Sequence, residues 1–156
     1  MFFQTEIVLK PIGVVRTTAV GDEVKDKTRT SQVIIRKELT TALEGIDGFS
    51  HLFVLFWLHK TSDERRKLLK VHPRRRKDLP LLGIFATRTM TRPNPVGLTL
   101  VELVKVEDNI LTVRGLDAFN GTPVLDIKPF DSWDTAETAK VPEWWTKLKK
   151  EKAQKL

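Results

Sequence analysis

Residues 101–116, VELVKVEDNILTVRGL, contain two apolar runs separated by a polar turn at residues 107–109. Val, Ile, Leu and Thr dominate both runs, and these residue types favour strands. In the second run Leu111 and Val113 fall on one face of a strand while Thr112 and Arg114 fall on the other, because side chains alternate along a strand. The stretch therefore predicts a β-hairpin with a three-residue turn.

Similar β-prone runs occupy much of the remaining chain. They lie at residues 6–16, 32–36, 52–58, 82–87 and 97–106, and Gly, Pro, Asn and Asp cluster at their ends. Helical patterns are fewer and fall at residues 37–43, 63–71 and 142–152. Many short strands at close spacing predict a mainly β single domain, a compact antiparallel sheet or barrel with one or two peripheral helices.

Composition excludes several classes of protein. The chain has 156 residues and no cysteine, so a disulfide framework, thiolate catalysis and Cys-ligated zinc are excluded. The longest apolar run, residues 52–58, is seven residues, far short of the ~20 that a membrane span needs. The N-terminal residues lack the features of a signal peptide. We therefore expect a cytoplasmic protein that has no membrane partner.

Positive charge is concentrated in one segment. The chain carries 27 Lys and Arg against 20 Asp and Glu, a net charge of +7, and residues 65–77, RRKLLKVHPRRRK, hold eight of the basic residues and no acid. Such a cluster repels itself, and a polyanion would stabilise it by releasing counterions. It is interpreted as a nucleic-acid contact, with a solvated loop as the alternative.

Common catalytic motifs are missing. The eight glycines form no GxG, which excludes the phosphate turn of a Rossmann site, and the three histidines show no HxH or HExxH spacing, so no metal site is predicted. Two other segments stand out. Residues 83–99, GIFATRTMTRPNPVGLT, contain a loop stiffened by Pro93 and Pro95. Residues 115–130, GLDAFNGTPVLDIKPF, place Asp117 and Asn120 on a turn that should project from a strand end.

Four segments together resemble one known family. They are PIGVVRT (11–17), GIDGFSHLFVLFWLH (45–59), GIFATRTMTRPNPVGLT (83–99) and LDAFNGTPVLDIKPF (116–130). In this order and spacing they are similar to the TrmO family of S-adenosylmethionine-dependent tRNA methyltransferases. The resemblance implies a non-Rossmann β-barrel, a homodimer, and methylation of N6 of threonylcarbamoyladenosine beside the anticodon. It also implies a methyltransferase domain at residues 1–135, followed by a helical tail at 136–156.

The resemblance implies a set of functional residues. The cofactor contacts fall on His59, Lys60, Arg88, Leu98, Asp117, Ala118, Phe119 and Asn120. The tRNA contacts are expected at Arg65, Arg66, Lys67, Arg74, Arg75, Arg76, Lys77 and Arg92. This chain lacks the Pro-Arg-Gln triplet of many bacterial members, for which Arg29 is a weak substitute, and it has Asn120 where the family usually has aspartate.

The sequence leaves several candidates for the catalytic base and for the residue that stacks on a base. His59 and Asp117 are the candidate general bases by residue type, while Trp57, Phe119 and Phe130 are candidates for stacking on a splayed base. Two other functions fit the same sequence. One is an RNA-binding barrel without catalysis, and the other is a methyltransferase that acts on a different RNA base or on a small molecule.

Overall fold

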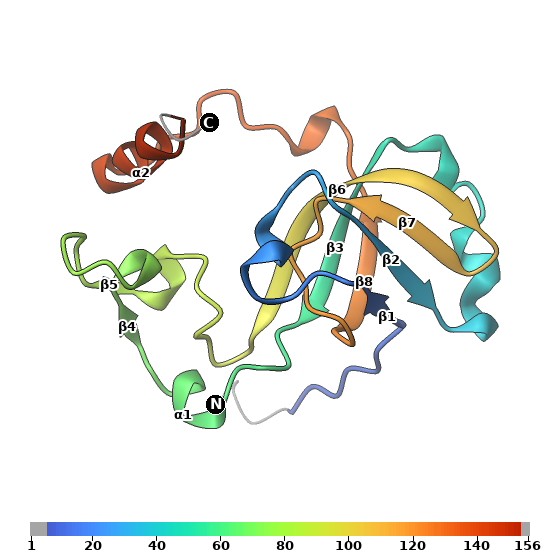
Figure 1. Cartoon of the computed structure of the whole chain (residues 1–156), viewed down its shortest axis with the longest axis horizontal. Helices are drawn as coiled ribbons and strands as arrows, with labels where there is room; N and C mark the ends of the chain where they lie inside the picture. The colour runs from blue at the N-terminus through green and yellow to red at the C-terminus, as the bar shows by residue number, and fades with distance from the viewer. Residues whose placement is uncertain (1–5, 154–156) are drawn as a thin grey trace. The chain divides into compact units, whose positions relative to one another are not determined.

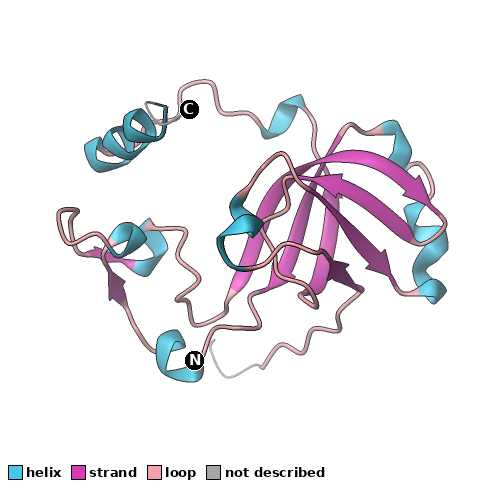
Figure 2. Ribbon diagram, viewed as in Figure 1, coloured by secondary structure: helices cyan, strands magenta, loops and turns pink. Residues whose placement is uncertain are grey.

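A computed structural model describes residues 6–153 (Figure 1). Six strands form a closed barrel in the order β1-β2-β7-β6-β3-β8. Their bounds are β1 (Gly13–Arg16), β2 (Thr30–Ile35), β3 (His51–Trp57), β6 (Val96–Glu107), β7 (Ile110–Arg114) and β8 (Pro123–Pro129). Every pairing in the barrel is antiparallel. The predicted mainly β fold is confirmed, and Figure 2 shows that the helical segments outside the barrel strands are short.

Alternating burial explains why these strands close around a core. In β3, Leu52, Val54 and Phe56 are at most 2% exposed, whereas the residues between them are half-buried on the outer face. In β7, Leu111 and Val113 are fully buried, as the period of two predicts. Residues of this kind from all six strands meet in one apolar cluster inside the barrel. Burial of their surface from water is the main stabilising contribution.

The hairpin is present, but its turn is shorter than predicted. Glu107 pairs with Ile110, so only Asp108 and Asn109 form the turn. Asp108 has a φ of +52°, a conformation that Asp tolerates better than most residues. The buried Asn109 side chain donates to the backbone oxygen of Ile35. This bond links the turn to β2 and accounts for a polar residue at the end of the core.

Two expected strand boundaries were wrong. The run at residues 6–16 forms a strand only from Gly13 onward, because Pro11 has no N–H to donate to a ladder. The run at 82–87 forms a two-residue strand, β5 (Leu82–Gly83), followed by the 3-10 turn η5 (Ile84–Ala86). Strand β8 was not predicted, since it begins and ends with proline and contains Asp and Lys.

Helical segments are short. The predicted helix at 63–71 stops as α1 (Asp63–Arg66), and the chain turns into β4 (Lys70–Val71). Like charges at Arg66 and Lys70, four residues apart, disfavour its continuation. The last helix, α2 (Glu143–Ala153), agrees with its prediction within one residue. Residues 37–43 form a 3-10 helix, η2 (Lys37–Leu43), and the other 3-10 turns are η1 (Gly21–Lys25), η3 (Ile46–Gly48), η4 (Pro73–Arg75) and η6 (Ser132–Asp134).

The backbone contacts divide the chain into two compact units. The barrel unit comprises Met1–Thr61 and Pro95–Asp131, and the second unit comprises Ser62–Asn94 and Ser132–Leu156. The predicted division into residues 1–135 and 136–156 stays a prediction. Within residues 6–153, no helix is long and apolar enough to cross a membrane.

Candidate functional site

One end of the barrel gathers most of the expected cofactor residues. Because neighbouring strands are antiparallel, β1, β3 and β7 end where β2, β6 and β8 begin. The pairs Trp57–Val96 and Thr30–Arg114 mark this end. The loops at residues 17–29, 58–61 and 115–122 therefore emerge together. The geometry confirms that the 115–122 loop projects from a strand end.

Backbone hydrogen bonds fix the 115–122 loop. Gly115 has a φ of +85°, and its N–H donates to the oxygen of Arg29 at 3.0 Å. Gly121 has a φ of +79°, and its N–H donates to the oxygen of Val15 at 2.8 Å. Both turns need a left-handed conformation, which glycine adopts without steric cost. The Asn120 side-chain oxygen accepts a hydrogen bond from the backbone N–H of Thr17 at 3.1 Å. The loop is thus tied to β1 and to the segment before β2.

Asp117 is the central acidic group of this loop. One of its carboxylate oxygens accepts a hydrogen bond from Thr99 of β6. The other lies 3.3 Å from the ammonium of Lys27, which also donates to the oxygen of Gly115 at 2.8 Å. The Asp117 side chain remains 40% exposed. An ionised carboxylate can accept about four hydrogen bonds, so Asp117 keeps capacity for a ligand.

Lys27 was not anticipated from the sequence. It lies in a polar loop 90 positions before Asp117, and no local pattern connects the two. Arg29, the expected substitute for the missing triplet, instead pairs with Glu23 at 3.5 Å. The loop between β1 and β2 therefore reaches the site through Lys27.

His59 and Lys60 meet the same loop from the end of β3. His59 Nδ1 lies 3.3 Å from the hydroxyl of Thr122, which is 2% exposed. The ammonium of Lys60 lies 3.9 Å from the ring centroid of Phe119, a cation–π contact. Since Nδ1 faces Thr122, Nε2 is the histidine nitrogen available to a ligand. Asp117 and Asn120 belong to the same loop as Phe119, so this end of the barrel brings together five of the eight expected cofactor residues.

The remaining expected cofactor residues lie differently. Leu98 is 59% exposed and pairs with Leu55 on the outer face of the barrel, opposite to the inward-facing Thr99. Ala118 is 3% exposed and belongs to the core cluster, so only its backbone is available to a ligand. Arg88 belongs to the second unit and is exposed. Their cofactor roles stay predictions.

The two units differ sharply in charge. The second unit holds 16 Lys and Arg against 7 Asp and Glu, a net charge of +9, whereas the barrel unit holds 11 against 13, a net charge of −2. All eight basic residues of the 65–77 run belong to the second unit. The net positive charge of the chain therefore resides in the second unit.

The basic run is not a uniform surface. Arg74 and Arg75 have φ values of +53° and +58°, a strained conformation that marks functional positions in many proteins. The ring of His72 closes their loop, with Nδ1 2.8 Å from the oxygen of Leu79. Arg66 pairs with Asp63 at 3.4 Å. The loop thus presents two adjacent arginines on a fixed backbone.

Arg76 is committed to carboxylates within the same unit. Its guanidinium donates to both oxygens of Asp78 and to Glu151 of α2. These hydrogen bonds hold the pKa of Asp78 well below its usual value of 3.8 and also lower the pKa of Glu151. Lys147 adds a 3.5 Å contact to Asp78. Arg76 therefore fastens α2 to the basic loop, so its availability to tRNA is reduced.

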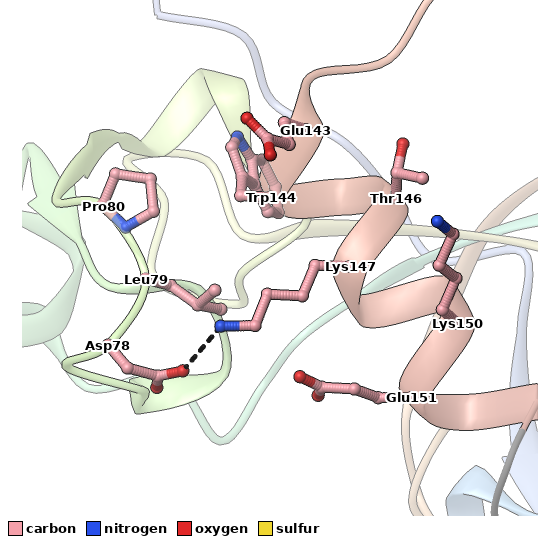
Figure 3. A pocket seen from close by; sticks show the side chains of 9 residues that line it. All are labelled: Asp78, Leu79, Pro80, Glu143, Trp144, Thr146, Lys147, Lys150 and Glu151. Atoms are coloured by element: carbon pink, nitrogen blue, oxygen red, sulfur yellow. Dashed lines mark hydrogen bonds and ion pairs between the residues drawn. The ribbon is translucent and has the colours of Figure 1, made fainter.

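A groove of about 590 Å³ lies between α2 and the segment Asp78–Pro80 (Figure 3). Trp144, Lys147 and Lys150 line it from the helix. It is distinct from the polar cluster at the barrel end. Among the described residues, no group of three or more His, Asp or Glu is arranged to hold a metal ion.

Comparisons with known proteins agree with the resemblance seen in the sequence. The model of the tRNA-methyltransferase O N-terminal domain matches residues 21–134. A probable S-adenosyl-L-methionine-binding protein of Methanothermobacter thermautotrophicus is 43% identical over 130 residues, which cover 80% of this chain and 90% of that protein. The rat tRNA (adenine(37)-N6)-methyltransferase is 45% identical over 89 residues, which cover 57% of this chain and 20% of that enzyme.

The fold is also similar to solved structures. The crystal structure of TrmO from P. aeruginosa superposes with a TM-score of 0.72 at 27% identity. That match covers 92% of this chain and 64% of the crystallised chain. The present chain therefore spans about two thirds of the length of its structural relative.

Proposed function

The chain belongs to the TrmO family of S-adenosylmethionine-dependent tRNA methyltransferases, and on that premise we propose that it methylates N6 of threonylcarbamoyladenosine beside the anticodon. The similarity to a tRNA (adenine(37)-N6)-methyltransferase supports this choice of acceptor. The observation that carries the proposal is the Asp117 cluster at the barrel end. It brings together the carboxylate of Asp117, the ammonium groups of Lys27 and Lys60, and the imidazole of His59 from three loops.

The residues present fit S-adenosylmethionine. This cofactor supplies a methyl group on a positively charged sulfur, and it also carries hydroxyl, ammonium and carboxylate groups. We propose that the spare capacity of Asp117 binds a hydroxyl or the ammonium, while Lys60 provides a cation for the carboxylate. The Phe119 ring beside Lys60 offers an apolar face. These are polar groups at fixed positions beside an apolar surface, as small-molecule sites require.

Positioning should supply most of the rate. Positive charge on the sulfur diminishes toward the transition state, so an unneutralised carboxylate beside it would stabilise the ground state more and slow the step. Here Lys27 partly neutralises Asp117 at 3.3 Å. Holding donor and acceptor in line is worth up to about 7–11 kcal/mol in favourable cases. The fixed loop and its glycine turns serve that purpose.

His59 is the better candidate for the general base. Both carboxylate oxygens of Asp117 are already engaged, one by the hydroxyl of Thr99 and the other by the ammonium of Lys27. His59 Nδ1 faces Thr122, which leaves Nε2 to accept the proton of the acceptor nitrogen. In this proposal, His59→Gln lowers kcat, and an unchanged kcat would point to another base.

Transfer of labelled methyl groups tests the acceptor. The protein is incubated with S-adenosylmethionine and tRNA that carries threonylcarbamoyladenosine, and the same tRNA without this modification serves as the control. Label in the modified tRNA alone supports the proposal. Equal labelling of both would show that the acceptor is another base, and label in a different RNA would also contradict it.

Calorimetry with S-adenosylmethionine tests the other alternative. An RNA-binding barrel without catalysis would release no heat of cofactor binding while still binding tRNA. A methyltransferase would bind the cofactor whichever acceptor it methylates. The two measurements together separate the three functions.

We also propose a homodimer that works in the cytoplasm, where its tRNA substrate would be found. Leu98 and Leu100 are 59% and 43% exposed on the outer face of β6, beside the half-buried Phe53 of β3. Apolar residues gathered in this way are typical of interfaces. Leu100→Lys should then shift sedimentation from about 36 to about 18 kDa, judged from a chain mass of 17.9 kDa. A parent protein that sediments as a monomer would contradict the homodimer.

A further inference from the structure

Phe85 is an exposed aromatic residue in the second unit. It is the central residue of η5, and 80% of its surface is accessible although its neighbour Ile84 is only 2% exposed. The η5 turn is well anchored, because Ile84 N–H donates to the oxygen of Leu69 at 3.0 Å and Thr87 Oγ1 donates to the oxygen of Ile84 at 2.8 Å. The ring therefore stands on a fixed backbone, pointing away from the core.

Arg92 supports this ring. Its guanidinium carbon lies 5.7 Å from the ring centroid of Phe85, within the range of a cation–π contact. Its Nη1 faces the backbone oxygens of Thr87 at 2.9 Å and of Ile84 and Thr89 at 3.4 Å. These carbonyls hold the guanidinium in place. The pair is thus preorganised, and binding to it costs little side-chain entropy.

The surroundings of the ring are basic. The second unit has a net charge of +9, and Arg88 follows Phe85 by three residues. Lys70 pairs through its backbone with Gly83, two residues before the ring. An exposed aromatic side chain among cations is the combination with which proteins bind unpaired bases of nucleic acids. The positive charge attracts phosphates, and the ring offers a flat surface to a base.

We propose that Phe85, supported by Arg92, is a stacking platform for an unpaired base of the RNA substrate. This inference rests on the proposed function, since it requires that the chain bind tRNA. It differs from the earlier expectation, in which Trp57, Phe119 or Phe130 would stack on the base. Phe119 already faces Lys60, and Phe130 makes an edge contact with Phe53 at 5.6 Å between centroids. Phe85 has the more exposed ring.

Substitutions at Phe85 separate stacking from other roles. Affinity for the tRNA is measured by fluorescence anisotropy, at several salt concentrations, for the parent, Phe85→Ala, Phe85→Leu and Phe85→Trp. Losing one stacked base weakens binding about 5-fold to 150-fold. We expect this loss for the Ala and Leu variants, and near-parental affinity for Trp. The salt slope should not change, because no phosphate contact is lost.

Leu69→Ala is the matched control. Leu69 is 70% exposed in the same unit, and its backbone oxygen accepts the hydrogen bond from Ile84 of η5. Its side chain is apolar but has no ring. Its replacement should leave tRNA affinity unchanged. A comparable loss in Leu69→Ala would show that general apolar contact, rather than stacking, is involved.

Three results would overturn the proposal that Phe85 is a stacking platform. Parental affinity of Phe85→Ala would show that the ring does not contact RNA. Full affinity of Phe85→Leu would show that a ring is not needed. Dissociation of a parental dimer in Phe85→Ala, with tRNA affinity unchanged, would assign the ring to an interface between copies. If the parent itself does not bind tRNA, the proposed function fails first and the platform with it.

Discussion

Replacing Asp117 with Asn tests the methyl-donor site most directly. The amide has nearly the same shape as the carboxylate, and its oxygen can still accept the hydrogen bond from Thr99. The change removes one negative charge and the 3.3 Å pairing with Lys27. The backbone turns at Gly115 and Gly121 do not depend on this charge. Asp117→Asn should therefore affect ligand binding more than folding.

The size of both effects follows from the geometry. A hydrogen bond to a charged group is worth about 1.5–3 kcal/mol, so affinity for S-adenosylmethionine should fall about 10-fold to 150-fold. The ion pair itself is worth little, because the side chains of Lys27 and Asp117 are 51% and 40% exposed. The free energy of unfolding should change by less than about 1 kcal/mol.

Isothermal titration with S-adenosylmethionine measures the affinity, and a second titration with adenosine identifies the group that is bound. Adenosine has the ribose hydroxyls but no amino acid group. A loss for both ligands would assign Asp117 to the ribose, whereas a loss for S-adenosylmethionine alone would assign it to the ammonium. Urea unfolding, followed in parallel, confirms that stability is retained.

Glu107→Gln is the matched control. Glu107 also pairs with a lysine, Lys105, at 2.7 Å, and its side chain is 56% exposed. It lies at the opposite end of the barrel, where β6 ends. Its replacement removes the same charge from the same unit and should leave both affinities unchanged. Parental binding by Asp117→Asn, or an equal loss in Glu107→Gln, would refute the placement of the site.

Three other perturbations have defined outcomes. Gly97→Ala should lower the free energy of unfolding by about 1–3 kcal/mol, measured in urea, because its added Cβ would lie 2.4 Å from the buried ring of Phe56; an unchanged midpoint would contradict this packing. Replacing both Arg74 and Arg75 with Ser should weaken tRNA binding and reduce the magnitude of the salt slope by about 1.5–2 without changing cofactor affinity; an unaltered slope would identify the segment as a solvated loop. The pKa of Asp78 is lowered by an arginine hydrogen bond, so its stabilising contribution is complete above the ordinary carboxyl pKa of about 4 and is lost as pH falls further. Hydrogen-exchange protection of α2 should decline below about pH 4 in the parent. In Asp78→Asn it should be reduced already at pH 7. Equal protection in the two proteins would exclude a contribution of Asp78 to the stability of α2.

Local periodicity was sufficient to predict a mainly β domain, and the family resemblance added that it closes as a barrel. The alternation around Leu52 and Leu111 identifies which face of each strand is buried, and such faces must close on one another to exclude water. The missing GxG turn correctly excluded a Rossmann fold. The loop carrying Asp117 was also predictable, because Asn-Gly followed by Thr-Pro strongly favours a turn.

Long-range pairs between charged side chains could not be predicted. Lys27 contacts Asp117 across 90 positions, and Arg76 contacts Glu151 across 75. In the sequence these lysine and arginine residues are indistinguishable from solvated ones, since only the fold decides which carboxylate each one meets. The consequence differs in the two cases. Lys27 joins the candidate site, whereas Arg76 pairs with Asp78 and Glu151, and its role as a tRNA contact stays a prediction.

The division of charge between the units has a consequence for the proposed reaction. The barrel unit has a net charge of −2, whereas the second unit, at +9, carries the net positive charge that favours binding of a polyanion. The candidate methyl-donor residues His59, Lys60 and Asp117 lie in the first, and Arg74, Arg75 and Phe85 lie in the second. Binding of tRNA should therefore depend steeply on salt and on residues of the second unit. Cofactor binding should depend on residues at the barrel end. It should depend only weakly on salt, because its contacts are short-range hydrogen bonds between few charges. Substitutions that weaken tRNA binding should leave cofactor affinity nearly unchanged, and substitutions that weaken cofactor binding should leave tRNA affinity nearly unchanged. Substitutions of either kind should reduce methyl transfer.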